Sequence, residues 1–106
     1  MRKLIYLIIG FSFACNQPAE NTPSTPYIMV LGIAQDAGYP QINCKKECCA
    51  AAWGNPELQR TTSCLAIVDP TSKEQWIIDA TPNIKEQLQL LKQKTGTEKL
   101  DGILLT

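Results

Sequence analysis

The end of the chain is the feature that most restricts what it can fold into. Residues 101–106, Asp-Gly-Ile-Leu-Leu-Thr, contain three consecutive large apolar residues, and such a run predicts a strand buried on both faces. Folding is expected only from Tyr27 onward, which leaves about 80 residues, and a core of that size is marginal by itself. We therefore expect the N-terminal part of a larger α/β domain. A complete small α/β domain is the alternative.

Apolar runs and turn residues predict the element order β-loop-α-β-β-α-β. Runs rich in β-branched and large apolar residues predict strands, and a short alanine-rich segment predicts a helix that stops before a glycine. Turn residues over 69–73 predict an antiparallel hairpin between two of the strands. The expected strands cover residues 27–33, 64–68, 75–79 and 100–105, and the expected short helix covers residues 47–53.

A second, longer helix is expected after residue 80. Thr81 is a good cap residue, and Pro82 suits the first helical turn. Spacings of four and three residues place three apolar side chains on one inner face, and Gly96 is a suitable stop. These three side chains are Ile84, Leu88 and Leu91.

The N-terminus has the pattern of an export signal. Met1-Arg2-Lys3 is basic, and an apolar run of about eleven residues follows and ends at Cys15, well short of the roughly 20 residues that span a bilayer. The small residue before Cys15 resembles the lipobox of bacterial lipoproteins, which predicts a lipidated Cys15. An ordinary signal peptide with an incidental cysteine is the alternative. The expected location is therefore outside the cytosol, anchored to a membrane and facing the periplasm or the cell exterior.

Residues 16–26 predict a flexible tether, since they include three prolines and almost no apolar residue. The domain is expected to cover residues 27–106. Ten basic and ten acidic residues give a formal net charge of zero, which argues against a nucleic acid as partner.

Four cysteines of the expected domain form a candidate zinc site. Thiolates a few residues apart on a turn can converge on a tetrahedral zinc ion at about 2.3 Å. In an oxidising compartment the same residues could form disulfides, although adjacent cysteines pair with difficulty. Buried unpaired thiols are a third interpretation. Cys44, Cys48 and Cys49 lie close together in the chain, and either Cys64 or a histidine beyond the chain end is expected as the fourth ligand.

Asp79 is the remaining candidate functional residue. It follows an expected strand and precedes the helix that begins near Thr81. Its carboxylate can cap that helix. Alternatively, it orients metal ligands that a neighbouring loop supplies.

Three segments resemble the family of coenzyme PQQ biosynthesis protein B, within the metallo-β-lactamase superfamily. The most specific of them is a glycine-aromatic-Pro-Gln motif that ends in Asn-Cys. The resemblance extends from Tyr27 to Thr106. The matching segments are residues 38–44, residues 62–67 and residues 80–84 followed by Gln87-Leu88.

The resemblance implies the N-terminal part of an αββα-sandwich metallo-hydrolase. In this superfamily the strand that resembles residues 103–106 leads into a histidine-rich loop that binds one or two catalytic metal ions, whereas this chain has no histidine. The resemblance also implies a supporting role for Asp79 beside that site. The family's cysteine cluster is Cys-x-Cys-x-x-Cys; here Cys44 and Cys49 match, but Lys46 replaces the middle cysteine and Cys48 is additional.

These sequence features support three functional hypotheses. The first is an exported metal-dependent hydrolase that acts on a small ester, phosphodiester or lactone. The second is a membrane-anchored, non-enzymatic binding module stabilised by zinc or disulfides. The third is an oxidative step related to PQQ biosynthesis.

Overall fold

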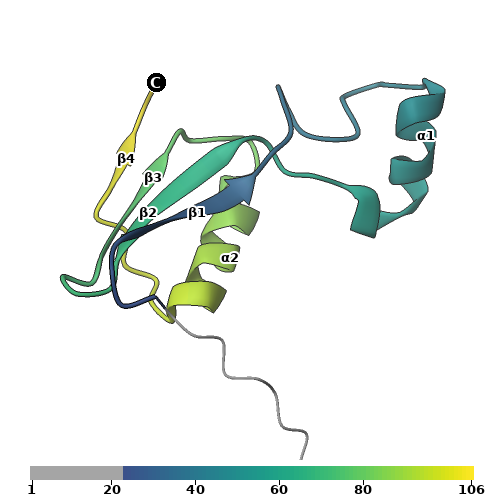
Figure 1. Ribbon diagram of the computed structural model, residues 1–106. Coiled ribbons are helices and arrows are strands. Elements are labelled where there is room, and N and C mark those ends of the chain that lie inside the picture. The colour runs from purple at the N-terminus through teal and green to yellow at the C-terminus, as the bar shows by residue number, and fades with distance from the viewer. Residues whose placement is uncertain (1–22) are drawn as a thin grey trace, which may run out of the picture.

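The computed structural model describes residues 23–106, and it confirms the expected order of elements (Figure 1). A short 3-10 helix, η1, is the one addition to that order. The elements are β1 (Tyr27–Gly32), α1 (Glu47–Gly54), η1 (Pro56–Leu58), β2 (Cys64–Asp69), β3 (Glu74–Ile78), α2 (Ile84–Thr95) and β4 (Gly102–Leu104). The predicted export segment with Cys15 lies outside the described residues, as does most of the predicted tether. In the described part of the chain, no helix is long and apolar enough to span a membrane.

The four strands form one sheet in the order β1-β2-β3-β4. The first three strands are antiparallel, which confirms the predicted hairpin between β2 and β3. The last pair, β3 and β4, is parallel. Parallel neighbours need a crossover connection, and α2 supplies it.

Helix α2 covers one face of the sheet and completes the core (Figure 1). Ile77 on β3 and Leu91 on α2 are almost fully buried. The alternating burial along β2 and β3 places every second side chain toward α2. The core cluster comprises Leu31, Cys64, Ala66, Val68, Ile77 and Leu91, with Ile84 and Leu88 packed against it, so the predicted inner face of the helix is confirmed.

The opposite face of the sheet is apolar and open to solvent. Strand pairing aligns Ile28 with Ile67 and Ile67 with Trp76, so these side chains share that face. The side chains of Ile28 and Trp76 are 66% and 36% exposed. The two faces of the sheet therefore differ: α2 covers one of them, and the other is apolar and exposed among the described residues.

Two details of the predicted elements were wrong. Thr81 does not cap α2: the N-cap is Asn83, and the Thr81 hydroxyl instead accepts a hydrogen bond from the Asn83 N–H and donates one to Gln87. The last strand is not buried on both faces. It is a short edge strand in which Ile103 is 42% exposed, since only β3 borders it and nothing in the described chain covers its outer face.

Gly96 ends α2 as predicted. It has φ 76°, and its N–H bonds to the carbonyl of Lys92. Glycine adopts this left-handed conformation without the steric penalty that a Cβ atom would bring.

The segment between β1 and β2 projects away from the sheet (Figure 1). We call residues 35–60 the cysteine lobe, since it carries α1, η1 and three of the cysteines. Its buried apolar side chains are only Cys49 and Ala52. A lobe with so little apolar burial must be held together mainly by hydrogen bonds or by a bound ion.

Candidate metal centre

Backbone pairing holds the base of the cysteine lobe closed. Tyr39 and Arg60 exchange hydrogen bonds, with N–H to carbonyl distances of 2.8 Å and 2.9 Å. Nearer the sheet, the N–H groups of Ile33 and Ala34 both donate to the Thr61 carbonyl. This narrow neck fixes where the loop before α1 begins and where the chain returns to β2.

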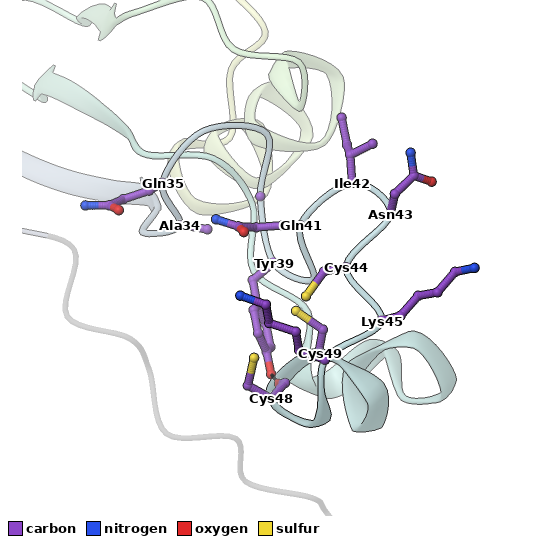
Figure 2. Close-up of a pocket in the computed structure, with 12 residues that line it drawn as sticks. Ala34, Gln35, Tyr39, Gln41, Ile42, Asn43, Cys44, Lys45, Cys48 and Cys49 are labelled. Carbon is purple, nitrogen blue, oxygen red and sulfur yellow. Dashed lines mark hydrogen bonds between the residues drawn. The ribbon is translucent and has the colours of Figure 1, made fainter.

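Three cysteine sulfurs meet where that loop enters α1. The Sγ atoms of Cys44, Cys48 and Cys49 all lie within 4.8 Å of one another, and Figure 2 shows them converging from the loop and the first turn of the helix. Cys49 is buried, Cys44 is half-buried and Cys48 is exposed. The sulfurs line a cavity of about 600 Å³ that is open to solvent and also bordered by Lys45 and Lys46.

The donor set fits zinc. A tetrahedral zinc ion bonded to sulfur at about 2.3 Å requires sulfurs that are roughly 3.8 Å apart, and sulfurs that all lie within 4.8 Å of one another are compatible with this spacing. Soft thiolates are also ligands that zinc prefers. The described residues supply three of the four ligands of a structural site, so the fourth position is left to another group.

The fourth predicted ligand, Cys64, is not part of this cluster. Its side chain is buried in the core beneath the sheet, and its thiol donates to the carbonyl of Asp79 over 3.7 Å. The strand alternation turns Cys64 toward α2, because it shares a face with Ala66 and Val68. The four described cysteines are free thiols in this structure.

The surroundings make the thiols of the cluster unequal. A hydrogen bond with Cys49 lowers the pKa of Cys44, helped by the backbone of Lys46. The same interaction raises the pKa of Cys49, and burial raises it further. Cys44 is therefore the more readily ionised of this pair, and the thiolate is the form that binds metal. Burial raises the pKa of Cys64, the isolated core thiol.

Asp79 lies just after β3 and does not cap α2. Its two carboxylate oxygens accept hydrogen bonds from the N–H and the hydroxyl of Thr106, at 2.9 Å and 2.8 Å. These bonds lower the pKa of Asp79, the N–H contributing most. The carboxylate therefore holds Thr106, two residues beyond the end of β4.

Two side chains donate to the cysteine loop: Tyr39, the aromatic residue of the motif at residues 38–44, and Trp53, which the sequence did not single out. The Tyr39 hydroxyl donates to the carbonyl of Cys48. The Trp53 indole N–H donates to the carbonyl of Cys44 at 2.7 Å. Each pair is nine positions apart in the chain, a separation that no periodic pattern would have revealed.

Comparison with known sequences identifies relatives of one kind. No family model matches the chain. Coenzyme PQQ synthesis protein B of Methylorubrum populi is 32% identical over 75 residues, which cover 70% of this chain and 25% of that protein. The corresponding protein of Rhodopseudomonas palustris is 38% identical over 85 residues, covering 74% of this chain and 27% of the relative. The chain thus spans about a quarter of the length of the curated relatives that it matches.

Comparison with solved structures identifies proteins with a similar fold. Zn²⁺-bound PqqB from Methylobacterium extorquens superimposes with a TM-score of 0.61 at 31% identity, covering 74% of this chain and 28% of that structure. A diphosphatase of the PhnP family superimposes with a TM-score of 0.56 at 26% identity, covering 76% of this chain and 29% of that structure. Both are metallo-β-lactamase-fold proteins, so the predicted fold class is confirmed.

Proposed function

The chain shares the metallo-β-lactamase fold and resembles PQQ synthesis protein B over about 70% of its residues, and we propose that it forms part of an exported metal-dependent hydrolase. The proposed substrate is a small molecule with an ester, phosphodiester or lactone bond. The observation that carries this proposal is the structural match to both a zinc-bound protein and a diphosphatase. The open apolar face of the sheet supports it, since a sandwich buries such a face against a second sheet.

We propose in addition that Cys44, Cys48 and Cys49 hold a structural zinc ion. The ion would link the loop to the first turn of α1, and so stabilise a lobe that buries only Cys49 and Ala52 as apolar side chains. Lys46, which stands where the family motif has a cysteine, contributes a cation beside the thiolates. Cys48, one residue before Cys49, provides the third sulfur from the helix instead.

Single substitutions test the zinc site. The purified chain carrying Cys15→Ser is expected to bind one zinc ion, and Cys44→Ser, Cys48→Ser and Cys49→Ser are each expected to abolish tight binding. Cys64→Ala is the matched control, because its thiol lies in the core away from the cluster. Metal content after gel filtration measures the outcome. Zinc retained by Cys48→Ser but lost by Cys64→Ala would contradict the proposed ligand set.

In the proposed hydrolase, the role of Asp79 is to position the chain segment that follows β4. Its hydrogen bonds to Thr106 direct the chain as it leaves β4, which is where the superfamily places its metal-binding histidines. The coding sequence beyond Thr106 is expected to encode a histidine-rich loop within the next few residues. Any other continuation would contradict the hydrolase proposal.

Protein expressed from the complete reading frame tests the proposed hydrolysis. Metal-dependent hydrolysis of an ester, phosphodiester or lactone probe is expected, with loss of activity after chelation. A folded protein that retains its zinc but hydrolyses none of the three probes would instead favour the non-enzymatic binding module. The name of the relatives supports the third hypothesis, an oxidative step related to PQQ biosynthesis; cytosolic location together with bound iron would favour it.

Export and anchoring are part of the same proposal, through lipidation of Cys15. The supporting pattern is the basic start, the apolar run and the small residue before Cys15. Cells grown with labelled palmitate are expected to label the full-length protein, and Cys15→Ala is expected to remove the label. Unlabelled protein recovered in the cytosol would contradict this part.

A further inference from the structure

Two aromatic side chains hold the backbone of the cysteine cluster from opposite ends of the lobe. Tyr39, at the neck, donates its hydroxyl proton to the carbonyl of Cys48. Trp53, near the end of α1, donates its indole N–H to the carbonyl of Cys44 at 2.7 Å. Both acceptors belong to residues whose sulfurs converge on one point.

The two donors are themselves well placed to fix the loop. The backbone of Tyr39 is paired with Arg60, so its ring extends from an anchored position toward Cys48 and Cys49 (Figure 2). The Trp53 side chain is 54% exposed, so apolar burial alone does not account for its position. The indole bond to Cys44 closes the loop back onto its own helix.

We propose that Tyr39 and Trp53 are positioning residues that keep the three sulfurs convergent before a metal ion binds. This inference rests on the proposed zinc site. A preformed loop loses less conformational freedom on binding than a mobile one. Groups that orient metal ligands without touching the metal typically contribute 10- to 100-fold to metal affinity.

Two conservative substitutions test the inference, each with a matched control. Tyr39→Phe removes one hydroxyl, and Trp53→Phe removes the indole N–H. Tyr27→Phe and Trp76→Phe make the same changes on β1 and β3, away from the lobe. All variants are made in the full chain with Cys15→Ser, and zinc affinity is measured by competition with a chromophoric chelator.

Tyr39→Phe and Trp53→Phe are each expected to weaken zinc binding on the order of 10-fold, whereas the controls leave it unchanged. The urea midpoint of the zinc-free chain should stay the same, because these bonds lie outside the core. Cobalt substitution should show weaker thiolate-to-metal charge transfer in the two lobe variants. The chain has two tryptophans, so Trp76→Phe leaves Trp53 as the only tryptophan, and its selectively excited emission should change when zinc is added.

Two results would overturn the inference in distinguishable ways. Wild-type chain that binds no zinc would remove the proposed metal site and the positioning role with it. Tight zinc binding that is equal in wild type, Tyr39→Phe and Trp53→Phe would leave the metal site intact and reject the positioning role alone. If Trp53→Phe fails to fold, the milder Tyr39→Phe decides the question.

Discussion

The carboxylate of Asp79 accepts two hydrogen bonds from Thr106, and these bonds close one end of the parallel pair of β3 and β4. At the other end, the Asp101 carboxylate accepts the N–H of Gln75 at 2.8 Å. The three-residue strand β4 is therefore fastened by an aspartate at each end. This arrangement compensates for a strand whose outer edge has no neighbour among the described residues.

Removing the Asp79 carboxylate should loosen the end of β4. Asp79→Ala deletes both acceptors and places an alanine at φ 69°, where a Cβ atom is strained. Amide hydrogen exchange is expected to accelerate at Thr106 and at position 79, whose own N–H bonds to Leu104. Asparagine tolerates this conformation and keeps one acceptor, so Asp79→Asn should be intermediate. Equal protection in wild type and Asp79→Ala would contradict the role.

Gly32 should not tolerate even one added methyl group. A Cβ atom there would lie 2.0 Å from the backbone carbonyl of Thr62, and this backbone leads directly into β2, so it cannot move aside without disturbing the sheet. Gly32→Ala is expected to cost about 1–3 kcal/mol in the free energy of unfolding. Gly54→Ala is the control, because its Cβ would meet nothing within 4 Å and alanine favours the helix by up to about 1 kcal/mol. Urea unfolding of both variants measures the difference.

Gln87 should be the most sensitive polar residue of α2. It is 1% exposed, donates to the carbonyl of Thr62 at 2.6 Å and accepts from the Thr81 hydroxyl. Gln87→Leu removes the acceptor of the Thr81 hydroxyl proton and the donor to the Thr62 carbonyl, and we expect a loss of roughly 1–3 kcal/mol. The same substitution at exposed Gln89 should change stability by less than about 0.5 kcal/mol. Similar losses at both positions would show that the buried hydrogen bonds contribute little.

The chain should lose stability in acid. The ion pair with Lys99, followed by the N–H of Gln75, lowers the pKa of Asp101 in the folded state. The folded chain therefore binds this proton less readily than the unfolded chain, so the stabilisation is complete above an unfolded pKa of about 4 and is lost as the pH falls through the lower folded value. Asp101→Asn should flatten that dependence in urea titrations between about pH 5 and pH 2.

The exposed Asp36 provides the charge-matched control for this experiment. Asp36→Asn removes one negative charge at a position where asparagine also tolerates the observed φ of 52°. Asp101→Asn is expected to flatten the slope more than Asp36→Asn does, because the Asp101 carboxylate pairs with Lys99 and accepts the Gln75 N–H. An equal flattening by both substitutions would assign the acid sensitivity to net charge and not to the bonds of Asp101.

The sequence by itself determined the order of elements, the hairpin and the inner face of α2. Each of these depends on residues that are close in the chain. The signals are the periodicity of strands and helices, the turn residues over 69–73, and a glycine at position 96 that can adopt φ 76°. The resemblance to a metallo-β-lactamase-fold family was also visible, since its motifs are short and contiguous. Local signals of this kind need no knowledge of how distant segments meet.

The tertiary structure alone decided which residues share a site. Spacing grouped Cys44, Cys48 and Cys49 and offered Cys64 as one possible fourth ligand, but strand alternation turns Cys64 into the core while the loop brings Cys44 to Cys48 and Cys49. Pairing β3 with β4 likewise placed Thr106 on Asp79, 27 residues away, and so excluded Asp79 as a helix cap. Residues that are distant in the chain meet only after all the elements between them have folded and packed. No local sequence pattern encodes that arrangement.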